Sequence, residues 1–399
     1  MKKILILVFL FVLFTLLIAD GTLPEGSGTE TDPYQIATLD NLLWLSTTET
    51  AWDSTYHFLQ MLDIDASETQ NWNDGAGFSP IGTVNYPFSG YYNGGNHNID
   101  GLYIYRPITD NIGLLGYTSG AIIEGLGITS ENITGLDNVG GLAGYCLNSI
   151  ISECYTTGSL SGNSELGGLV GYNYGSTISE SFAIVSVTGN TNVGGLAGQN
   201  AVSSMISDCY ATGNVIGGEF VGGLTGTNFN NSTINNCYAT GSVEGTGWRI
   251  GGLVGTNVNW STVSNCVWNL ATSGQASAMG YNNANGIISN IITATTEEMQ
   301  MMSTYTAIGW DFAGETVNGT EDIWEINSEL NNGYPFISDL NWSLGELLAS
   351  FDAAPTFGYT PLTVNFMDES VPEDHIVSWQ WDFDGDGTID SDEQDPSFI

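Results

Sequence analysis

The sequence predicts an all-β fold, a right-handed parallel β-helix or β-solenoid with about 27–29 residues per coil. One short phrase, such as VGGLAG, occurs six times, with starts at Ile112, Val139, Leu166, Val193, Val221 and Ile250. These starts lie 27, 27, 27, 28 and 29 residues apart, which is the period of a stacked repeat. The segments between them are rich in Val, Ile, Tyr and Thr, as strands are. Helical repeats are disfavoured because a glycine inside a helix costs about 1 kcal/mol.

Matching residues at one position of successive repeats predict that the strands stack in register. Seven residues after the repeat starts stand Asn173, Asn200, Asn228 and Asn257, with Cys146 in the same place one unit earlier. Stacked amides of this kind bond to one another along the stack. A second column, fifteen or sixteen residues after the starts, holds Cys154, Phe182, Cys209, Cys237 and Cys266.

Two features of the chain resemble a known family. The stretch Phe88–Ile104, FSGYYNGGNHNIDGLYI, and the GGL[AVT]G copies resemble the GLUG-motif repeats of bacterial extracellular proteins. Segments 25–46, 295–312 and 323–337 resemble those that usually precede and follow such repeats. The resemblance covers about residues 25–345 and implies a β-helix on the cell surface or in secreted material. It implies no enzymatic activity.

Residues 1–19 have the features of a secretory signal peptide. Lys2 and Lys3 precede a long apolar run that ends at Ala19, a plausible cleavage point. The alternative is a retained membrane anchor, whereas a lipoprotein is disfavoured because no cysteine lies near the end of the segment. We therefore expect a bacterial protein exported to the cell surface or the medium, without membrane insertion once the signal is cleaved.

The rest of the chain divides into an N-terminal cap with the first coils (20–111), the repeat solenoid (112–292) and a C-terminal cap (293–345). Apolar residues at helical spacing predict a short helix that covers the first coil: Leu39, Leu42, Leu43, Trp44 and Leu45. Thr295 and Glu298 form a capping-box pattern, which predicts a short helix near the other end. The caps are expected to protect the open strand edges.

Residues 349–399 differ in pattern from the repeats. The alternation in Pro361–Phe366 and the aromatic segment around Trp379 and Trp381 resemble a PKD domain, an immunoglobulin-like β-sandwich. An immunoglobulin-like sandwich takes about 100 residues. We therefore interpret this segment as an incomplete PKD-like domain.

An acidic loop within that segment follows the pattern D-x-D-x-D-G-x₅-E of calcium-binding loops. Ca²⁺ prefers six to eight oxygen ligands, and aspartates at alternate positions supply them. The alternative is a solvated acidic turn, because the preceding WQWDF is strand-like rather than helical. If the site exists, its Ca²⁺ is structural, and the candidate ligands are Asp382, Asp384, Asp386, Thr388 through its carbonyl, Asp390 and Glu393.

The five cysteines have three interpretations. Free thiols in a buried column are favoured, because free Cys behaves as a small apolar residue. A disulfide among Cys209, Cys237 and Cys266 is the second, since the chain is expected to be exported. Metal ligation is the third and the weakest, because no pair has the C-x-x-C spacing of zinc sites.

The charge of the chain limits its partners. The formal net charge is −40, and loss of the two leader lysines leaves two arginines against 44 acidic residues, so 2 − 44 = −42. Such a surface repels nucleic acid and anionic membranes and attracts divalent cations. Solubility alone is an equally good explanation of the charge.

No catalytic or cofactor-binding residues are predicted. A polysaccharide lyase needs a base and cations at one place, and only Arg106 and Arg249 are available as cations. The histidines His57, His97 and His375 accompany no nucleophile motif. The acidic residues of the repeats are scattered without an evident pair: Asp100, Asp137, Glu165, Asp208 and Glu219.

Three residues in the last repeats suggest a binding surface. Trp248 and Arg249 lie in the longest repeat, and Trp260 follows soon after. Aromatic faces beside asparagines bind sugars, whereas packing against the next coil is the alternative. We therefore predict a non-enzymatic adhesin or extracellular scaffold, with glycans or matrix and surface proteins as partners. The alternative is an accessory or spacer region of a larger secreted enzyme, a protease or polysaccharide-degrading enzyme, with its catalytic domain beyond residue 399.

Overall fold

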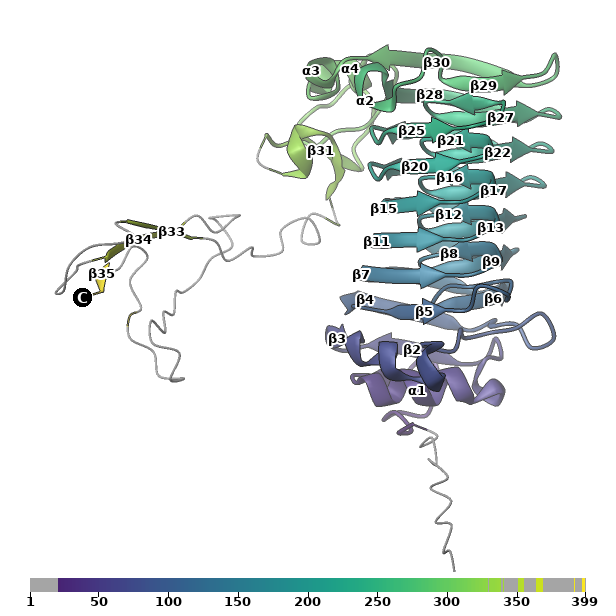
Figure 1. The fold of residues 1–399 in the computed structure, drawn as a ribbon, viewed down its shortest axis with the longest axis vertical. Helices are drawn as coiled ribbons and strands as arrows, with labels where there is room; N and C mark the ends of the chain where they lie inside the picture. The colour runs from purple at the N-terminus through teal and green to yellow at the C-terminus, as the bar shows by residue number, and fades with distance from the viewer. Residues whose placement is uncertain are drawn as a thin grey trace, which may run out of the picture.

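The computed structural model describes residues 21–328, 330–338 and 340, and near the C-terminus residues 351–354, 364–368, 391 and 397–398. The predicted signal peptide, residues 1–19, and the acidic loop ligands from Asp382 to Glu393 lie outside these residues. Most of the described chain forms one tall stack of coils (Figure 1).

Three parallel sheets run along this stack. The largest has 18 strands: β1 (Tyr34–Ile36), β2 (His57–Gln60), β3 (Ile64–Asp65), β4 (Tyr91–Asp100), β5 (Tyr103–Tyr105), β7 (Ile122–Thr134), β10 (Ile150–Ser152), β11 (Tyr155–Ser161), β14 (Thr177–Ser179), β15 (Phe182–Thr188), β18 (Met205–Ser207), β19 (Tyr210–Ala211), β20 (Val215–Gly217), β23 (Thr233–Asn235), β24 (Tyr238–Ala239), β25 (Val243–Gly245), β28 (Thr262–Asn269) and β30 (Ile287–Ala294).

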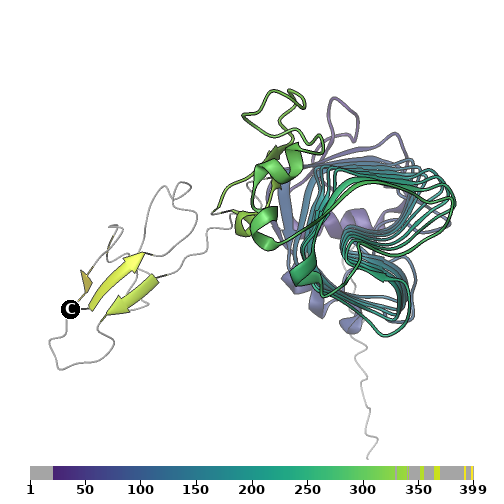
Figure 2. The same ribbon diagram turned by 90° about the horizontal axis from the view of Figure 1, so that it is seen from above.

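The two smaller parallel sheets complete each coil. A five-stranded sheet contains β8 (Asp137–Gly140), β12 (Ser164–Gly167), β16 (Thr191–Gly194), β21 (Glu219–Gly222) and β26 (Ile250–Gly251). A seven-stranded sheet contains β6 (Leu115–Ser119), β9 (Ala143–Leu147), β13 (Val170–Tyr174), β17 (Ala197–Ala201), β22 (Thr225–Phe229), β27 (Val254–Val258) and β29 (Met279–Asn282). Seen along the stack, the coils superimpose, as Figure 2 shows.

The strands pair in parallel with their equivalents one repeat away, as the sequence predicts. Val139 pairs with Leu166, Leu166 with Val193, and Val193 with Val221. The prediction of an all-β parallel solenoid is therefore confirmed.

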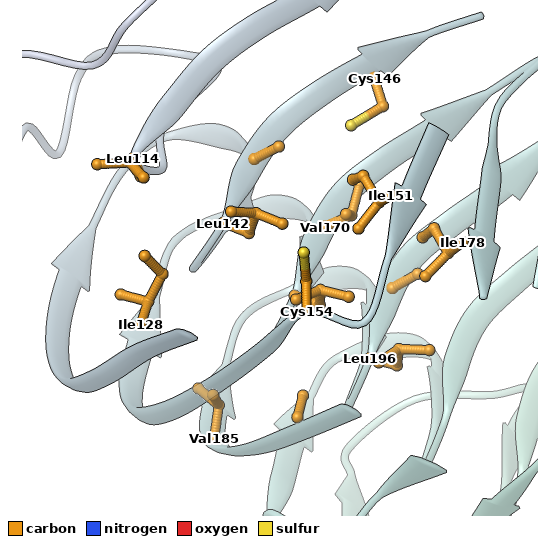
Figure 3. Packing of buried hydrophobic residues seen from close by; sticks show 14 of the residues in the cluster. Leu114, Ile128, Leu142, Cys146, Ile151, Cys154, Val170, Ile178, Val185 and Leu196 are labelled. Carbon is orange, nitrogen blue, oxygen red and sulfur yellow. The ribbon is translucent and has the colours of Figure 1, made fainter. Parts of the chain in front are cut away.

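The core lies inside the coils and is built from columns of equivalent residues (Figure 3). The column that contains Ile151 and Ile178 runs on in register through every coil from Ile123 to Val263, and all its members in that range are fully buried. Each coil thus buries its apolar side chains against its neighbours rather than within itself.

The glycine pair of the repeat is explained by close approach of the coils. A Cβ on Gly168 would lie 2.3 Å from the carbonyl oxygen of Gly195 in the next coil, and one on Gly195 would lie 2.2 Å from that of Gly223. These paired glycines do not have positive φ. A side chain at these positions would push adjacent coils apart.

The asparagine column forms the predicted ladder inside the solenoid. Asn173 donates from Nδ2 to Oδ1 of Asn200 (2.8 Å), Asn200 to Asn228 (2.9 Å) and Asn228 to Asn257 (2.9 Å). Asn282 extends the ladder by one more coil, because its Oδ1 accepts from Asn257 at 2.8 Å. The ladder begins at Asn173, whose own Oδ1 is unpaired because Cys146 occupies the preceding coil.

The second predicted column was wrong at one position. Ser181, not Phe182, occupies the cysteine column, since the Ser181 hydroxyl accepts from the backbone N–H of Cys154 at 3.1 Å. Phe182 pairs in register with Tyr155 and Tyr210 instead. The error arose because the repeat lengthens from 27 to 28 residues between these coils. All five cysteines are free and buried, as the favoured interpretation predicts.

The N-terminal end of the solenoid is closed by helix α1 (Leu39–Thr47), at the bottom of the stack in Figure 1. Thr38 caps this helix, and Leu42 and Leu45 are fully buried against the core. Short 3₁₀ turns complete this end: Glu49–Ala51, Ser67–Asn71 and Asn73–Gly75.

The segment after the last coil does not cover the C-terminal end of the stack, contrary to the prediction. Its elements are α3 (Thr296–Met299), α4 (Met302–Thr306), a 3₁₀ turn at Asn331–Gly333 and the antiparallel strands β31 (Trp324–Glu325) and β32 (Phe336–Ile337). The short helix α2 (Leu270–Ser273) lies earlier, between β28 and β29 of the last coil. The predicted capping box at Thr295 and Glu298 is present. Residues 299–340 pack against the side of the solenoid, on a ladder of aromatic rings.

We call this ladder the covered aromatic ladder. Its rings stack in register, with centroids 5.0 Å apart for Tyr155 and Phe182, 4.7 Å for Phe182 and Tyr210, and 4.9 Å for Tyr210 and Tyr238. Trp310, Trp324 and Tyr305 lie against it, and all these rings are buried.

Three further strands are described near the C-terminus. They are β33 (Phe351–Ala354), β34 (Val364–Asp368) and β35 (Ser397–Phe398), and they pair antiparallel. A small antiparallel sheet is compatible with the predicted PKD-like sandwich.

Candidate ligand-binding face

The described residues contain no group of three or more His, Cys, Asp or Glu side chains arranged to hold a metal ion. The predicted calcium ligands Asp382, Asp384, Asp386, Thr388, Asp390 and Glu393 lie outside the described residues. The calcium site therefore remains a prediction from the sequence.

The histidines and arginines of the described chain lie apart from one another. His97 pairs with Asp63 (Nδ1 to Oδ1, 3.1 Å) at the surface, and the ring of His57 packs on Tyr91. Arg106 donates to the carbonyl of Phe78 and the hydroxyl of Ser79, which is a structural role. His375 lies outside the described residues.

Two of the carboxylates that appear scattered in the sequence are neighbours in the fold. Burial raises the pKa of Glu165, Asn192 lowers it by donating a hydrogen bond at 3.0 Å, and the charges of Asp137 and Asp110 raise it further. These acidic residues belong to three successive coils on one outer corner of the solenoid.

This outer corner is built by a column of residues with positive φ, where the chain enters the five-stranded sheet. The column comprises Asn111, Asn138, Glu165, Asn192, Phe220 and Arg249, with φ between 53° and 64°. Its side chains contact one another between coils, as Asn138 does by donating to Asn111 at 3.1 Å.

One column of the seven-stranded sheet lies directly beside these residues; Thr227 and Thr256 in it are buried, and its other members are exposed in part. Its members are Tyr117, Tyr145, Tyr172, Gln199, Thr227, Thr256 and Tyr281, paired in register. Thr227 links the two columns because its hydroxyl donates to Oδ1 of Asn192 at 2.6 Å. We call the two columns together the corner face.

A stack of half-buried tyrosines occupies the N-terminal half of the corner face. The rings of Tyr117 and Tyr145 are parallel at 4.7 Å, and Tyr172 meets Tyr145 edge-on at 4.8 Å. Tyr174 adds a further ring 6.0 Å from Tyr172. Burial, and then the neighbouring Tyr172 and Tyr117, raise the pKa of Tyr145, so the hydroxyls of this stack are neutral hydrogen-bonding groups at neutral pH.

An arginine among aromatic rings occupies the C-terminal half. The Arg249 guanidinium carbon lies 5.0 Å from the ring centroid of Phe220, 4.7 Å from that of Trp248 and 4.6 Å from that of Tyr281. Within the described part of the chain no carboxylate lies within ion-pair distance of Arg249, despite 44 acidic residues in the sequence. Its N–H groups therefore remain available to a ligand.

Trp260 does not join this cluster. The ring contacts found in the described chain connect Trp248 to Phe220 and Arg249, and none of them involves Trp260. The two indoles are nevertheless exposed to similar extents, 58% for Trp248 and 62% for Trp260. The predicted Trp248–Trp260 surface thus separates into two places, and only Trp248 contacts residues of the corner face.

A cavity of about 720 Å³ lies at the opposite end of the molecule, beside α1. Leu39, Leu43 and Trp72 form its apolar wall, and Asp40, Glu68 and Asp74 lie at it as well. Neither a histidine nor a cysteine lines it, so its carboxylates and hydroxyls have no imidazole or thiol beside them.

The corner face presents aromatic rings beside amide, carboxylate and guanidinium groups. Aromatic rings pack against the C–H faces of sugars, while amides, carboxylates and guanidinium groups bond to hydroxyls. The tyrosine stack and the Arg249 cluster lie at opposite ends of the face, with the buried Thr227 and Thr256 between them.

Sequence reasoning found Trp248 and Arg249 but missed the tyrosine stack, Phe220 and Tyr281. The signal was present, since Tyr145 and Tyr172 directly precede the Cys146–Asn173 column. Phe220 and Tyr281 carry no such signal, because their contacts with Arg249 depend on how the two sheets meet.

Comparison with known proteins identifies the repeats. The GLUG motif matches four consecutive stretches, 162–188, 189–216, 217–244 and 246–267. The chain therefore carries GLUG repeats, as the resemblance implied. The match does not reach residues 349–399, so the PKD-like domain remains a prediction.

Two curated proteins are similar to part of the chain. Halomucin of Haloquadratum walsbyi is 33% identical over 138 residues, which is 34% of this chain and 2% of halomucin. A protein of Evansella cellulosilytica named "Putative Gly-rich membrane protein" is 33% identical over 113 residues, 27% of this chain and 12% of that protein. The chain thus matches only a small part of either relative.

One solved structure shares the fold. A Bacteroides ovatus protein described as a "putative immunoglobulin A1 protease" superimposes with a TM-score of 0.57 at 19% identity, over 78% of this chain and 94% of that one. At this identity the similarity concerns the fold alone.

Proposed function

We propose that the chain is a non-enzymatic adhesin or scaffold of the cell surface or extracellular space, and that its corner face binds glycans. The observation that carries the proposal is Arg249, held between three aromatic rings with no carboxylate partner among the described residues. The formal net charge of the chain is −40, and Arg249 nevertheless has no acidic partner among the described residues. Its guanidinium group is therefore free to bind an acidic ligand. Arg249 favours glycans with an acidic group, because a guanidinium forms bidentate hydrogen bonds with carboxylates and sulfates.

The extracellular placement is supported by the GLUG repeats and by the similarity to halomucin. The expected signal peptide, residues 1–19, agrees with it. No helix in the described part of the chain is long and apolar enough to cross a membrane. The predicted Ca²⁺ ion in the acidic loop would stiffen the C-terminal segment and takes no part in this binding.

The test is an array of neutral and acidic oligosaccharides and of matrix proteins, probed with residues 20–399 with and without Ca²⁺. We expect saturable binding, strongest to acidic sugars, without breakdown of the bound ligand. Breakdown of any ligand would overturn the non-enzymatic assignment, and absence of binding to every sugar would overturn the glycan assignment.

A second candidate function is a spacer or accessory region of a larger secreted enzyme. The shared fold with the Bacteroides ovatus protein is the observation that favours it. The gene sequence downstream of the codon for Ile399 tests it, because a catalytic domain there is expected on this hypothesis.

A further inference from the structure

The two ends of the solenoid are finished differently. At the N-terminal end α1 covers the core with Leu42 and Leu45, both fully buried. At the C-terminal end β30 pairs only with β28, and β29 only with β27, so each leaves one backbone edge unpaired among the described strands. Figure 1 shows these strands at the top of the stack.

The apolar core itself is open at this end. The inward column that is fully buried from Ile123 to Val263 continues in register to Ile288, whose side chain is 41% exposed. Ile287, on the outward column beside it, is 51% exposed, and Tyr281 of β29 is 42% exposed. Only the polar ladder is terminated, because Asn282 turns its Nδ2 onto the carbonyls of Asn283 and Gly286.

The strands of the open end also carry no charged residue of their own, although Arg249 packs on the ring of Tyr281. No Asp, Glu, Lys or Arg occurs from residue 250 to residue 296, a run of 47 residues in a chain with 48 charged residues among 399. That run contains no proline either. Natural proteins usually protect an edge strand with charges, prolines or a covering segment, and this end has none of the first two.

We infer that the C-terminal end of the solenoid is a self-association surface, where β30 of one copy pairs with β30 of a second copy about a two-fold axis. A two-fold arrangement pairs the same edge on both copies, which makes the strands antiparallel and buries Ile287 and Ile288 of each. The partner is a second copy because the strands of this end carry no acidic residue, so two such acidic chains approach there with the least repulsion. Two solenoids joined end to end in this way present two corner faces, one on each copy.

Sedimentation equilibrium of residues 20–399 tests this inference with matched variants. Ile287→Glu introduces charge at the open edge, and Ile150→Glu is its control. Ile150 belongs to the same outward column in mid-stack and is exposed to a similar extent, 45% against 51%. Ile288→Glu is a second variant directed at the open core, and circular dichroism verifies the fold of each.

We expect the native mass to rise with concentration toward twice that of one chain, and more readily at high salt, which screens the acidic surfaces. Ile287→Glu and Ile288→Glu are expected to raise the dissociation constant by about tenfold or more, and Ile150→Glu to leave it within about twofold. A native chain that stays monomeric at every concentration overturns the inference. So does a dimer that tolerates Ile287→Glu, or growth beyond the dimer, because either places the contact elsewhere. If Ile288→Glu fails to fold, Ile287→Glu still decides the question.

Discussion

The solenoid carries two columns of stacked aromatic rings on its outer surface. A later segment of the chain covers one of them and leaves the other open to solvent. The covered aromatic ladder, from Tyr155 to Tyr238, is buried under residues 299–340. The tyrosine stack of the corner face, from Tyr117 to Tyr172, has similar ring spacing but remains half-buried and open to solvent. Stacking in register therefore does not distinguish a structural from a functional ladder. What distinguishes them is whether another segment of the chain lies on top.

The difference extends to the polar groups beside each ladder. The hydroxyl of Tyr238 is satisfied within the fold, because it donates to the carbonyl of Pro335 at 2.6 Å and accepts from Asn331. At the corner face the carboxylate of Glu165 and the amide of Asn192 contact each other and remain partly exposed. The hydroxyl of Tyr210 in the covered ladder has no partner, but it is fully buried and out of reach of a ligand. Access from solvent is therefore the reason to expect a ligand at the second ladder and not at the first.

The largest expected effect is a difference in the free energy of unfolding between variants of the two ladders. Tyr238→Ala removes a buried ring that contacts Trp310 and Trp324, so we expect the free energy of unfolding to fall by about 3–5 kcal/mol. Tyr172→Ala at the open stack should cost less than about 1 kcal/mol. Urea denaturation of both variants measures the difference, and equal losses would contradict the distinction.

A second prediction concerns the interior ladder that holds both outer ladders in register. Asn200→Ala leaves Oδ1 of Asn228 without its partner, and leaves Nδ2 of Asn173 with only its bond to the carbonyl of Ser176 at 3.3 Å. We expect a loss of about 2–3 kcal/mol in the free energy of unfolding. Asn190→Ala, at an exposed asparagine outside the ladder and without positive φ, is the control and should change it by less than about 1 kcal/mol. A neutral result for Asn200→Ala would mean that the ladder does not stabilise the stack.

A third prediction compares a carboxyl inside the coils with one at the corner. Glu131 is 2% exposed, neither of its carboxyl oxygens has a partner, and burial raises its pKa well above the usual value. The unfolded chain therefore loses this proton near pH 4.5 while the folded chain retains it. Because the folded state binds more protons, its stability is full below that pH and declines as the pH rises, by about 1.4 kcal/mol per unit, until the folded group ionises.

The variant Glu131→Gln tests this sign. We expect the unfolding free energy of Glu131→Gln to depend less on pH than that of the native chain between about pH 4.5 and 7, and to be higher at pH 7. Glu165→Gln, at the half-exposed and hydrogen-bonded corner position, should show a smaller change in the same direction. A steeper dependence for Glu131→Gln would contradict the burial of an unpaired carboxyl.

The smallest expected effect concerns the cysteines. Because all five thiols are free and fully buried, a reductant should leave the melting temperature unchanged. Burial raises the pKa of Cys154 to about 12, so thiol reagents should modify it only after unfolding. A drop in melting temperature on reduction would indicate a disulfide and exclude the column of free thiols.

Much of the fold was predictable because the repeat imposes it. The spacing of the VGGLAG phrase gave the coil length, and the asparagine column gave the register of Asn173 with Asn200. The neighbouring column was misplaced by one residue at Phe182, because a single added residue between coils shifts the count without changing the residue types nearby. Local patterns fix which residues repeat, but not where a one-residue insertion falls.

The candidate site was predictable only in part. Trp248 and Arg249 stood out in the sequence because the repeat lengthens there, and the exposed Trp260 was grouped with them only by closeness in the chain. Contacts between Arg249 and Tyr281 join residues of different coils, so no local pattern reveals them. The packing of residues 299–340 on the side of the stack was missed for the same reason, since helix signals do not indicate which surface a helix covers.

The decisive measurement is the binding of native, Trp248→Ala and Trp260→Ala proteins to the same array of neutral and acidic oligosaccharides. The two tryptophans are almost equally exposed, and only Trp248 contacts Arg249. We predict that Trp248→Ala weakens binding by about tenfold or more while Trp260→Ala retains the native affinity. Equal effects of the two variants, or binding that neither changes, would contradict a ligand-binding corner face.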